Sequence, residues 1–267
     1  MSTQPVSNPS ETPAEMPFPA PCHTLELTAP LRWLRLGWRD LTAVPRLSLS
    51  YGAALTLISM LIGVLTWQLG TLALYLGLAT GFVFIGPILA VGLYSISRQR
   101  ELGLVPFMGF CIQQGLHHVR GLLVLGLVLL VVLLVWARAA AMVHVFVPVE
   151  AEAGWQGMIP FLAIGSSIGL IFASIVFSAC AFSLPMIMDR KVDEITAVVS
   201  SINAVLSNKG AMLVWGGLIG LVVLSGFATG FLSFVVLLPV VGHATWHAYR
   251  ETIDASAWPK NMPGEGD

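Results

Sequence analysis

Residues 47–97 read LSLSYGAALTLISMLIGVLTWQLGTLALYLGLATGFVFIGPILAVGLYSIS and contain no charged side chain. This run of 51 residues lies between Arg46 and Arg98. One helix that crosses a membrane needs only about 20 apolar residues, so two helices must share the run. The most polar break, at residues 67–71, separates predicted spans at 50–67 and 71–97.

Further apolar runs follow toward the C-terminus. Residues 210–249 carry no formal charge, and a single helix of that length would extend about 60 Å, twice the thickness of the hydrocarbon core. A break near Leu224 to Gly226 divides residues 210–249 into two spans. The sequence therefore predicts an all-α, polytopic transmembrane bundle of six spans in three hairpins. The four later spans are predicted at 121–147, 159–188, 210–225 and 228–249.

Composition agrees with a membrane protein. Hydrophobic residues make up 56% of the chain and charged residues 10%, which is more apolar surface than a soluble core of this size buries. The 13 Lys+Arg and 14 Asp+Glu nearly cancel, and no basic cluster alternates with aromatic residues. This excludes a nucleic-acid groove. The three cysteines form no metal or disulfide motif and are predicted to be free thiols.

The positions of the cations predict the orientation. Lys and Arg are retained on the cytoplasmic side of short loops, and twelve of the thirteen fall on one side of the predicted spans. Both termini are therefore expected in the cytoplasm. These twelve residues are Arg32, Arg35, Arg39, Arg46, Arg98, Arg100, Arg120, Arg190, Lys191, Lys209, Arg250 and Lys260.

The ends of the chain are polar. Residues 1–27 are rich in proline, and the first 21 lack both Lys and Arg and the apolar segment of a signal peptide. A retained, disordered tail is predicted there. The membrane domain is assigned to residues 28–250 and a polar tail to 251–267.

An amphipathic segment precedes each hairpin. Leu31, Leu34, Trp38 and Leu41 recur at helical spacing, and similar stripes run through residues 108–119 and 192–206. These cytoplasmic helices are expected either to lie in the headgroup plane or to pack under the bundle. The alternative is that they simply connect the spans.

Each returning span combines a GxxxG motif with a later proline, at Pro87, Pro185 and Pro239. GLATGF in one span recurs as GFATGF in another, and eleven positions separate both Pro87 from Arg98 and Pro239 from Arg250. This spacing indicates an internal repeat. The small faces and proline kinks serve either helix packing or a cavity or hinge.

His243 and His247 are the candidate metal ligands. They stand at i and i+4, so one helix face presents both imidazoles, but two ligands make an incomplete site. The alternative is an interfacial belt with Trp246 and Tyr249, hydrogen-bonded to headgroups and to Arg250.

Three charged residues near span ends are further candidates. Arg138 either snorkels to the outer interface or forms an ion pair with Glu150 or Glu152, which would indicate a permeation path. Asp189 and Arg190 follow the segment with Pro185 and either gate a kinked helix or end it at the interface.

Several short motifs together resemble those of one family. The motifs are LGWRDL at 36–41, SLSYG at 48–52, GPILAVGLY at 86–94, FSLPMIMDR at 182–190 and GHATWHAYR at 242–250. They resemble the bacterial predicted integral membrane proteins grouped as domain of unknown function 2189, over roughly residues 25 to 255. The resemblance implies a bacterial inner membrane and no established activity.

No catalytic triad, zinc-protease, phosphate-loop or dinucleotide motif occurs in a credible context, so a non-enzymatic protein is predicted. The first hypothesis is a small-molecule or ion carrier, or a scaffold for a membrane complex, with the lipid bilayer and other membrane proteins as partners. No cofactor is predicted. The alternative is a metal- or haem-handling membrane factor that uses His243 and His247.

Overall fold

The computed structural model describes residues 17–69, 86, 88–107, 109, 111, 119–146 and 154–261. Within these ranges the chain forms helices and no strand, as the sequence predicts. The longer helices are α2 (Pro45–Leu69), α6 (Val119–Phe146), α7 (Gly154–Cys180), α10 (Lys209–Ala228) and α11 (Phe234–Thr252). The shorter ones are α1 (Ala29–Ala43), α4 (Val91–Glu101), α8 (Ser183–Asp189) and α9 (Glu194–Ser207).

Four segments are long and apolar enough to cross a membrane, namely Pro45–Leu65, Leu123–Val143, Ile159–Asp189 and Lys209–Ala228. They coincide with the predicted spans at 50–67, 121–147, 159–188 and 210–225. The predicted span at 71–97 falls largely outside the described residues. The predicted span at 228–249 corresponds to α11, which carries more polar residues and is not among the four.

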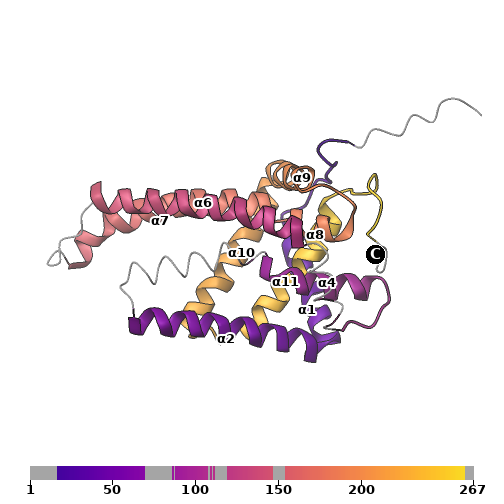
Figure 1. Cartoon of the computed structure of the whole chain (residues 1–267), viewed down its shortest axis with the longest axis horizontal. Coiled ribbons are helices and arrows are strands. Elements are labelled where there is room, and N and C mark those ends of the chain that lie inside the picture. Colours follow the sequence, from indigo (N-terminus) through magenta and orange to yellow (C-terminus); the bar gives the residue numbers. More distant parts are fainter. Residues whose placement is uncertain are drawn as a thin grey trace, which may run out of the picture.

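The short helices gather at one end of the bundle. In Figure 1, α6 and α7 run side by side as a hairpin, and α2 extends in the same direction below them. α1, α4, α8 and α9 lie toward the right-hand end, where the C-terminus is marked. Polar side chains from several helices are therefore brought together at that end.

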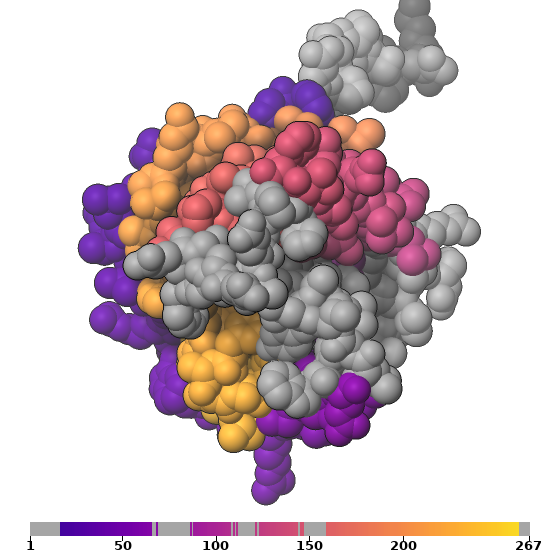
Figure 2. All heavy atoms as spheres, turned by 90° about the vertical axis from the view of Figure 1, so that its left-hand side faces the viewer, coloured from indigo at the N-terminus to yellow at the C-terminus, as the bar shows by residue number. Residues whose placement is uncertain are grey.

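The other end carries the turn between α10 and α11. Figure 2 faces this end, with the turn in yellow-orange and α6 and α7 in pink and red. Gly230 and Phe231 have φ angles of 58° and 70°, and this left-handed backbone reverses the chain. The turn follows the predicted break at residues 224–226 by a few residues because α10 continues to Ala228.

α11 lies at the centre of the packing, against α1 and α2. A Cβ on Gly37 of α1 would meet the carbonyl oxygen of Val240 and lie 2.8 Å from the backbone nitrogen of Ala244. Gly52 of α2 similarly faces the carbonyl oxygen of Val235. Glycine at these two positions lets the helix backbones approach closely.

The predicted apolar stripes mark the faces that bind the bundle only in part. In α1, Leu31 and Trp38 are exposed, whereas Leu41 is buried and Leu34 packs against the core. In α9, Ile195 and Leu206 are exposed, whereas Val198 packs against the core. The buried face of α9 consists mainly of small residues, namely Thr196, Ala197, Ser200, Ser201, Ala204 and Val205. The stripe at 108–119 lies largely outside the described residues.

Parts of both predicted tails contact the helices. The backbone nitrogen of His23 donates to the carbonyl of Thr252 at 2.8 Å, and that of Asp254 donates to Pro21 at 2.9 Å. The backbone nitrogen of Ala20 donates to the hydroxyl of Ser200 at 2.9 Å. Residues 1–16 and 262–267 lie outside the described ranges. The three cysteines are free thiols, as predicted.

Candidate functional site

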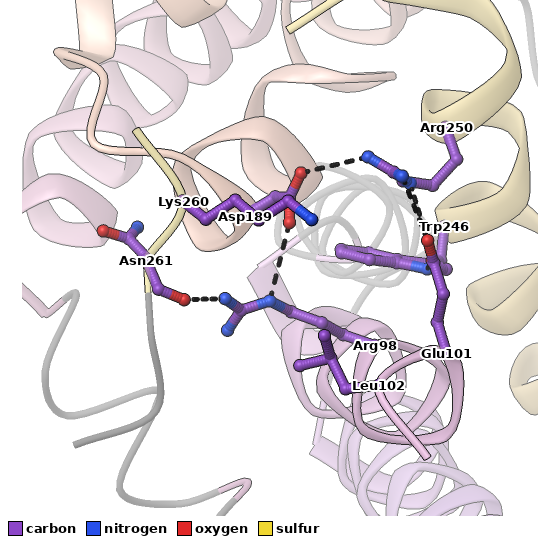
Figure 3. A pocket seen from close by; sticks show the side chains of 8 residues that line it. All are labelled: Arg98, Glu101, Leu102, Asp189, Trp246, Arg250, Lys260 and Asn261. Carbon is purple, nitrogen blue, oxygen red and sulfur yellow. Dashed lines mark hydrogen bonds and ion pairs between the residues drawn. The ribbon is translucent and has the colours of Figure 1, made fainter. Parts of the chain in front are cut away.

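Three returning helices, α4, α8 and α11, meet at the polar end, and each ends on charged residues. Charged side chains favour helix ends because they can reach hydrated surroundings at a membrane interface. Here several of them instead turn toward one another (Figure 3). We call the resulting cluster of Arg98, Glu101, Asp189, Arg190 and Arg250 the junction.

Asp189 is the common acceptor of the junction. Its side chain is 8% exposed, and its Oδ2 accepts hydrogen bonds from Tyr249 Oη at 3.0 Å, Arg190 Nε at 3.0 Å and Arg250 Nη1 at 3.3 Å. Arg98 Nε lies 3.7 Å from the other oxygen, Oδ1. One buried carboxylate thus connects α4, α8 and α11.

Glu101 forms the second acidic position of the junction. It accepts a hydrogen bond from Trp246 Nε1 at 2.8 Å and one from Arg250 Nε at 3.0 Å. Arg250 therefore bridges Glu101 on α4 and Asp189 on α8. Such charge-assisted hydrogen bonds are stronger than those between neutral groups.

The C-terminal segment covers the junction. The backbone nitrogen of Asn261 donates to the carbonyl of Asp189 at 2.9 Å, and its side-chain amide donates to Ile187 and Arg190. Arg98 Nη2 donates to the carbonyl of Asn261. A recess of about 30 Å³ remains between α4, α8, α11 and this segment (Figure 3).

A second polar cluster surrounds His243, whose side chain is fully buried. Its Nε2 lies 2.9 Å from the hydroxyl of Ser48 and its Nδ1 lies 2.8 Å from that of Ser97. The Ser97 hydroxyl donates to Asp40 Oδ2 at 2.7 Å, so it must accept from Nδ1–H. Both ring nitrogens of His243 are thus hydrogen-bonded, and in the neutral tautomer Ser48 donates to Nε2.

Asp40 joins this cluster to the surface. Its Oδ2 lies 2.9 Å from His247 Nε2, and its Oδ1 pairs with Arg100. Burial alone would raise the pKa of Asp40 and favour its neutral form. The hydrogen bonds with His247 and Ser97 outweigh burial and hold the pKa of Asp40 below its ordinary value of 3.8.

The two predicted metal ligands have different partners. His243 faces Ser48 and Ser97, whereas His247 faces Asp40. Within the part of the chain that the structure describes, no three His, Cys, Asp or Glu residues are placed to hold a metal ion. The histidine pair as a metal site stays a prediction.

The other predicted residues fall in several places. Asp189 and Arg190 both belong to the junction. Pro185 is buried in α8, and Pro239 is buried inside α11, where it faces Gly52. Arg138 is exposed on α6. Pro87, Glu150 and Glu152 lie outside the described residues, so a kink at the first and an ion pair with the other two stay predictions.

One family comparison bears on these residues. Residues 74–189 match the model of a family described as "Predicted integral membrane protein (DUF2189)". The resemblance is confirmed over this stretch, which includes Arg98, Glu101 and Asp189. Asp40, His243 and the remaining α11 residues lie outside it. No curated protein and no solved structure matched this chain.

The DUF2189 description and the four apolar segments agree that the chain is an integral membrane protein. Sequence reasoning missed several residues of the site, namely Asp40, Ser48, Ser97, Arg98 and Glu101. One signal pointed to Arg98, because it follows Pro87 at the same spacing as Arg250 follows Pro239. Both arginines contact Asp189, which agrees with an internal repeat.

Proposed function

We propose that the protein is a non-enzymatic scaffold of a membrane complex in a bacterial inner membrane. It crosses the membrane six times, as three hairpins each preceded by a cytoplasmic amphipathic helix. The observation that carries this proposal is the junction. A buried carboxylate and its arginines tie the ends of α4, α8 and α11 together, which supports a rigid frame.

The distribution of charge supports this orientation. α1 and the ends of α4, α8 and α11 hold most of the cations, and they lie at the same end of the bundle (Figure 1). A concentration of Lys and Arg on one side is typical of the cytoplasmic side. Both termini are accordingly proposed to be cytoplasmic.

A scaffold fits the polar end better than a carrier does. A carrier needs a polar cavity that a solute can occupy, and drug-sized ligand sites measure about 300–1,000 Å³. The recess at the junction measures about 30 Å³. The carboxylates of Asp189 and Glu101 are also already bound by the chain's own donors.

Burial of a serine–histidine pair supports a non-enzymatic role. Ser48 Oγ lies 2.9 Å from His243 Nε2, a distance at which a histidine can activate a serine. Both side chains are 0% exposed, so a substrate has no access to the hydroxyl. The pair instead links α2 to α11.

The test is the state of the protein in its native membranes. We expect the tagged full chain, extracted in mild detergent, to migrate on native gels as an assembly larger than the purified chain. Asp189→Asn should reduce the assembled fraction although the chain still inserts, and Glu26→Gln, which alters an exposed carboxylate, should not. The scaffold proposal fails if native membranes hold only the isolated chain, or if purified protein supports solute flux in liposomes.

The same preparation tests the metal- or haem-handling alternative. That function predicts a Soret band or stoichiometric metal, which the His243→Ala, His247→Ala double variant loses. Colourless, metal-free protein from native membranes would contradict it.

A further inference from the structure

The charges around the recess do not balance. Arg98, Arg250 and Lys260 line it as cations, and Glu101 and Asp189 line it as anions. Arg250 hydrogen-bonds both carboxylates, and Asp189 is also bound by Arg190, which lies outside the lining. Among the described residues no ion pair involves Lys260. The recess therefore keeps an excess of positive charge.

Arg98 is the most buried of these cations. It is 5% exposed, yet of its five N–H donors one binds the carbonyl of Asn261, and its Nε lies a long 3.7 Å from Asp189. No hydrogen bond of its Nη1 group occurs among the described residues. Burial lowers the pKa of Arg98, and attraction to Asp189 offsets this only in part. None of the Arg98 nitrogens is among the described buried atoms that lack a partner, so its unbonded N–H groups reach solvent and are available to a ligand. A cation that is largely withdrawn from water gains from an anionic partner.

The recess has room for part of such a partner. Its volume of about 30 Å³ exceeds the roughly 10–15 Å³ that one water needs. It is only partly enclosed, and the exposed side chain of Lys260 stands at its margin (Figure 3). The oxygens of one tetrahedral anion can enter from outside while its remaining substituent stays in solvent or lipid.

We propose that the recess between Arg98, Arg250 and Lys260 binds a phosphate-bearing anion. Arginine supplies forked donors that match phosphate oxygens, and lysine adds a point charge. The recess lies at the ends of the returning helices, where a bilayer would place its headgroups. Free phosphate and the phosphate of a lipid headgroup share this chemistry. The inference goes beyond the scaffold function and does not depend on it.

The experiment has two arms, both on the purified full chain. In nonionic detergent, calorimetry measures binding of inorganic phosphate against sodium chloride of equal ionic strength. In nanodiscs of phosphatidylcholine, native mass spectrometry measures retention of added phosphatidic acid. Binding in the first arm assigns the site to the free anion, and binding only in the second assigns it to the headgroup. Either result supports the site.

Two substitutions distinguish anion binding in the recess from general electrostatic attraction to the protein. Lys260→Gln should weaken binding about tenfold, the loss of one charge-assisted contact. Lys209→Gln removes an exposed lysine from the start of α10, away from the recess, and should change binding less than about twofold. Absence of binding in both arms, or equal losses in the two variants, would overturn the proposal.

Discussion

Asp189 has an unusual position for a carboxylate in a membrane protein. It ends α8 and is nearly buried, but three arginines surround it, namely Arg98 of α4, Arg250 of α11 and Arg190, which directly follows α8. Placing a charge in such surroundings costs free energy unless every oxygen is paired. The hydrogen bonds from Tyr249, Arg190 and Arg250 supply that pairing.

Removing the charge of Asp189 should therefore leave Arg98 and Arg190, which are both buried, without the carboxylate that they face. We expect Asp189→Asn to lower the free energy of unfolding by about 3–5 kcal/mol, the usual cost of breaking a buried pair. Thermal unfolding in detergent measures the effect. Glu26→Gln changes an exposed carboxylate and should stay within about 0.5 kcal/mol of the unsubstituted chain. Equal midpoints for the two variants would contradict the role of Asp189.

Glu251 gives a prediction about pH. Burial raises its pKa, but hydrogen bonds from Arg32 and Trp33 outweigh burial, so its pKa in the folded protein lies below the ordinary 4.5. Its stabilising contribution is thus complete above pH 4.5 and is lost as the pH falls through the folded value. The measurement compares the unfolding midpoint of the natural chain with that of Glu251→Gln over a range of pH. The difference between the two midpoints should stay constant near neutral pH and become smaller below pH 4.5. A difference that persists in acid would contradict this pairing.

At the scale of residues, the sequence identified Asp189, Arg190 and His243 but not their partners. The contacts that build the site join residues far apart, such as Ser97 with Asp40 across 57 positions and His247 with Asp40 across 207. Local periodicity shows which residues share a helix face. It does not show which helices come together.

At the scale of elements, the amphipathic helices show a consequence of membrane surroundings. In water, the apolar stripe of a helix faces the core because the alternative is exposure to solvent. Beside a bilayer, large apolar residues can face lipid while small residues face the protein. Exposed Leu31 and Trp38 in α1, with Gly37 buried, follow this second pattern. The stripe therefore predicted the helix but only part of the face that binds the bundle, since Leu41 is buried and Leu34 packs against the core.

Gly37 provides a test of the contact between α1 and α11. A methyl group there would clash with the backbone of α11, so we expect Gly37→Ala to destabilise the protein by about 1–3 kcal/mol. A methyl group on Gly217 of α10 would meet no neighbouring helix within 4 Å among the described residues. Gly217→Ala should be neutral, or stabilising by up to about 1 kcal/mol through helix propensity. Chemical unfolding followed by circular dichroism compares the two, and a tolerant Gly37 would exclude the close approach.

For the whole molecule, the apolar runs of sequence predicted that the chain is helical. They also predicted the positions of the four long apolar segments in the structure. They did so because the bilayer thickness fixes the length of a span. α11 is the informative exception. It combines an apolar first half with His243, His247 and Arg250, since its second half packs against polar side chains of α1, α2 and α4. Hydropathy alone does not separate such a helix from a surface helix.

The six-span topology predicts the outcome of reporter fusions. Alkaline phosphatase fused after Trp67, Glu152 or Gly230 should be active, because the proposed topology assigns these positions to the periplasm. A fluorescent protein at the C-terminus should fold in the cytoplasm, and a phosphatase at Gly103 should be inactive. If the C-terminus were periplasmic and the N-terminus cytoplasmic, the number of spans would be odd. This result would exclude the proposed arrangement.

The contact of Arg98 with Asn261 also bears on how the protein is made. The arginine leaves the ribosome 163 residues before the carbonyl that it binds. During that interval α4 and α8 are already synthesised, but the segment that covers their charges is not. Chains that stop before Asn261 therefore lack the carbonyl that binds Arg98. In such incomplete products we expect the side chain of Arg98 to be more exposed at the membrane surface than in the finished protein, a difference by which quality-control proteases could distinguish the two.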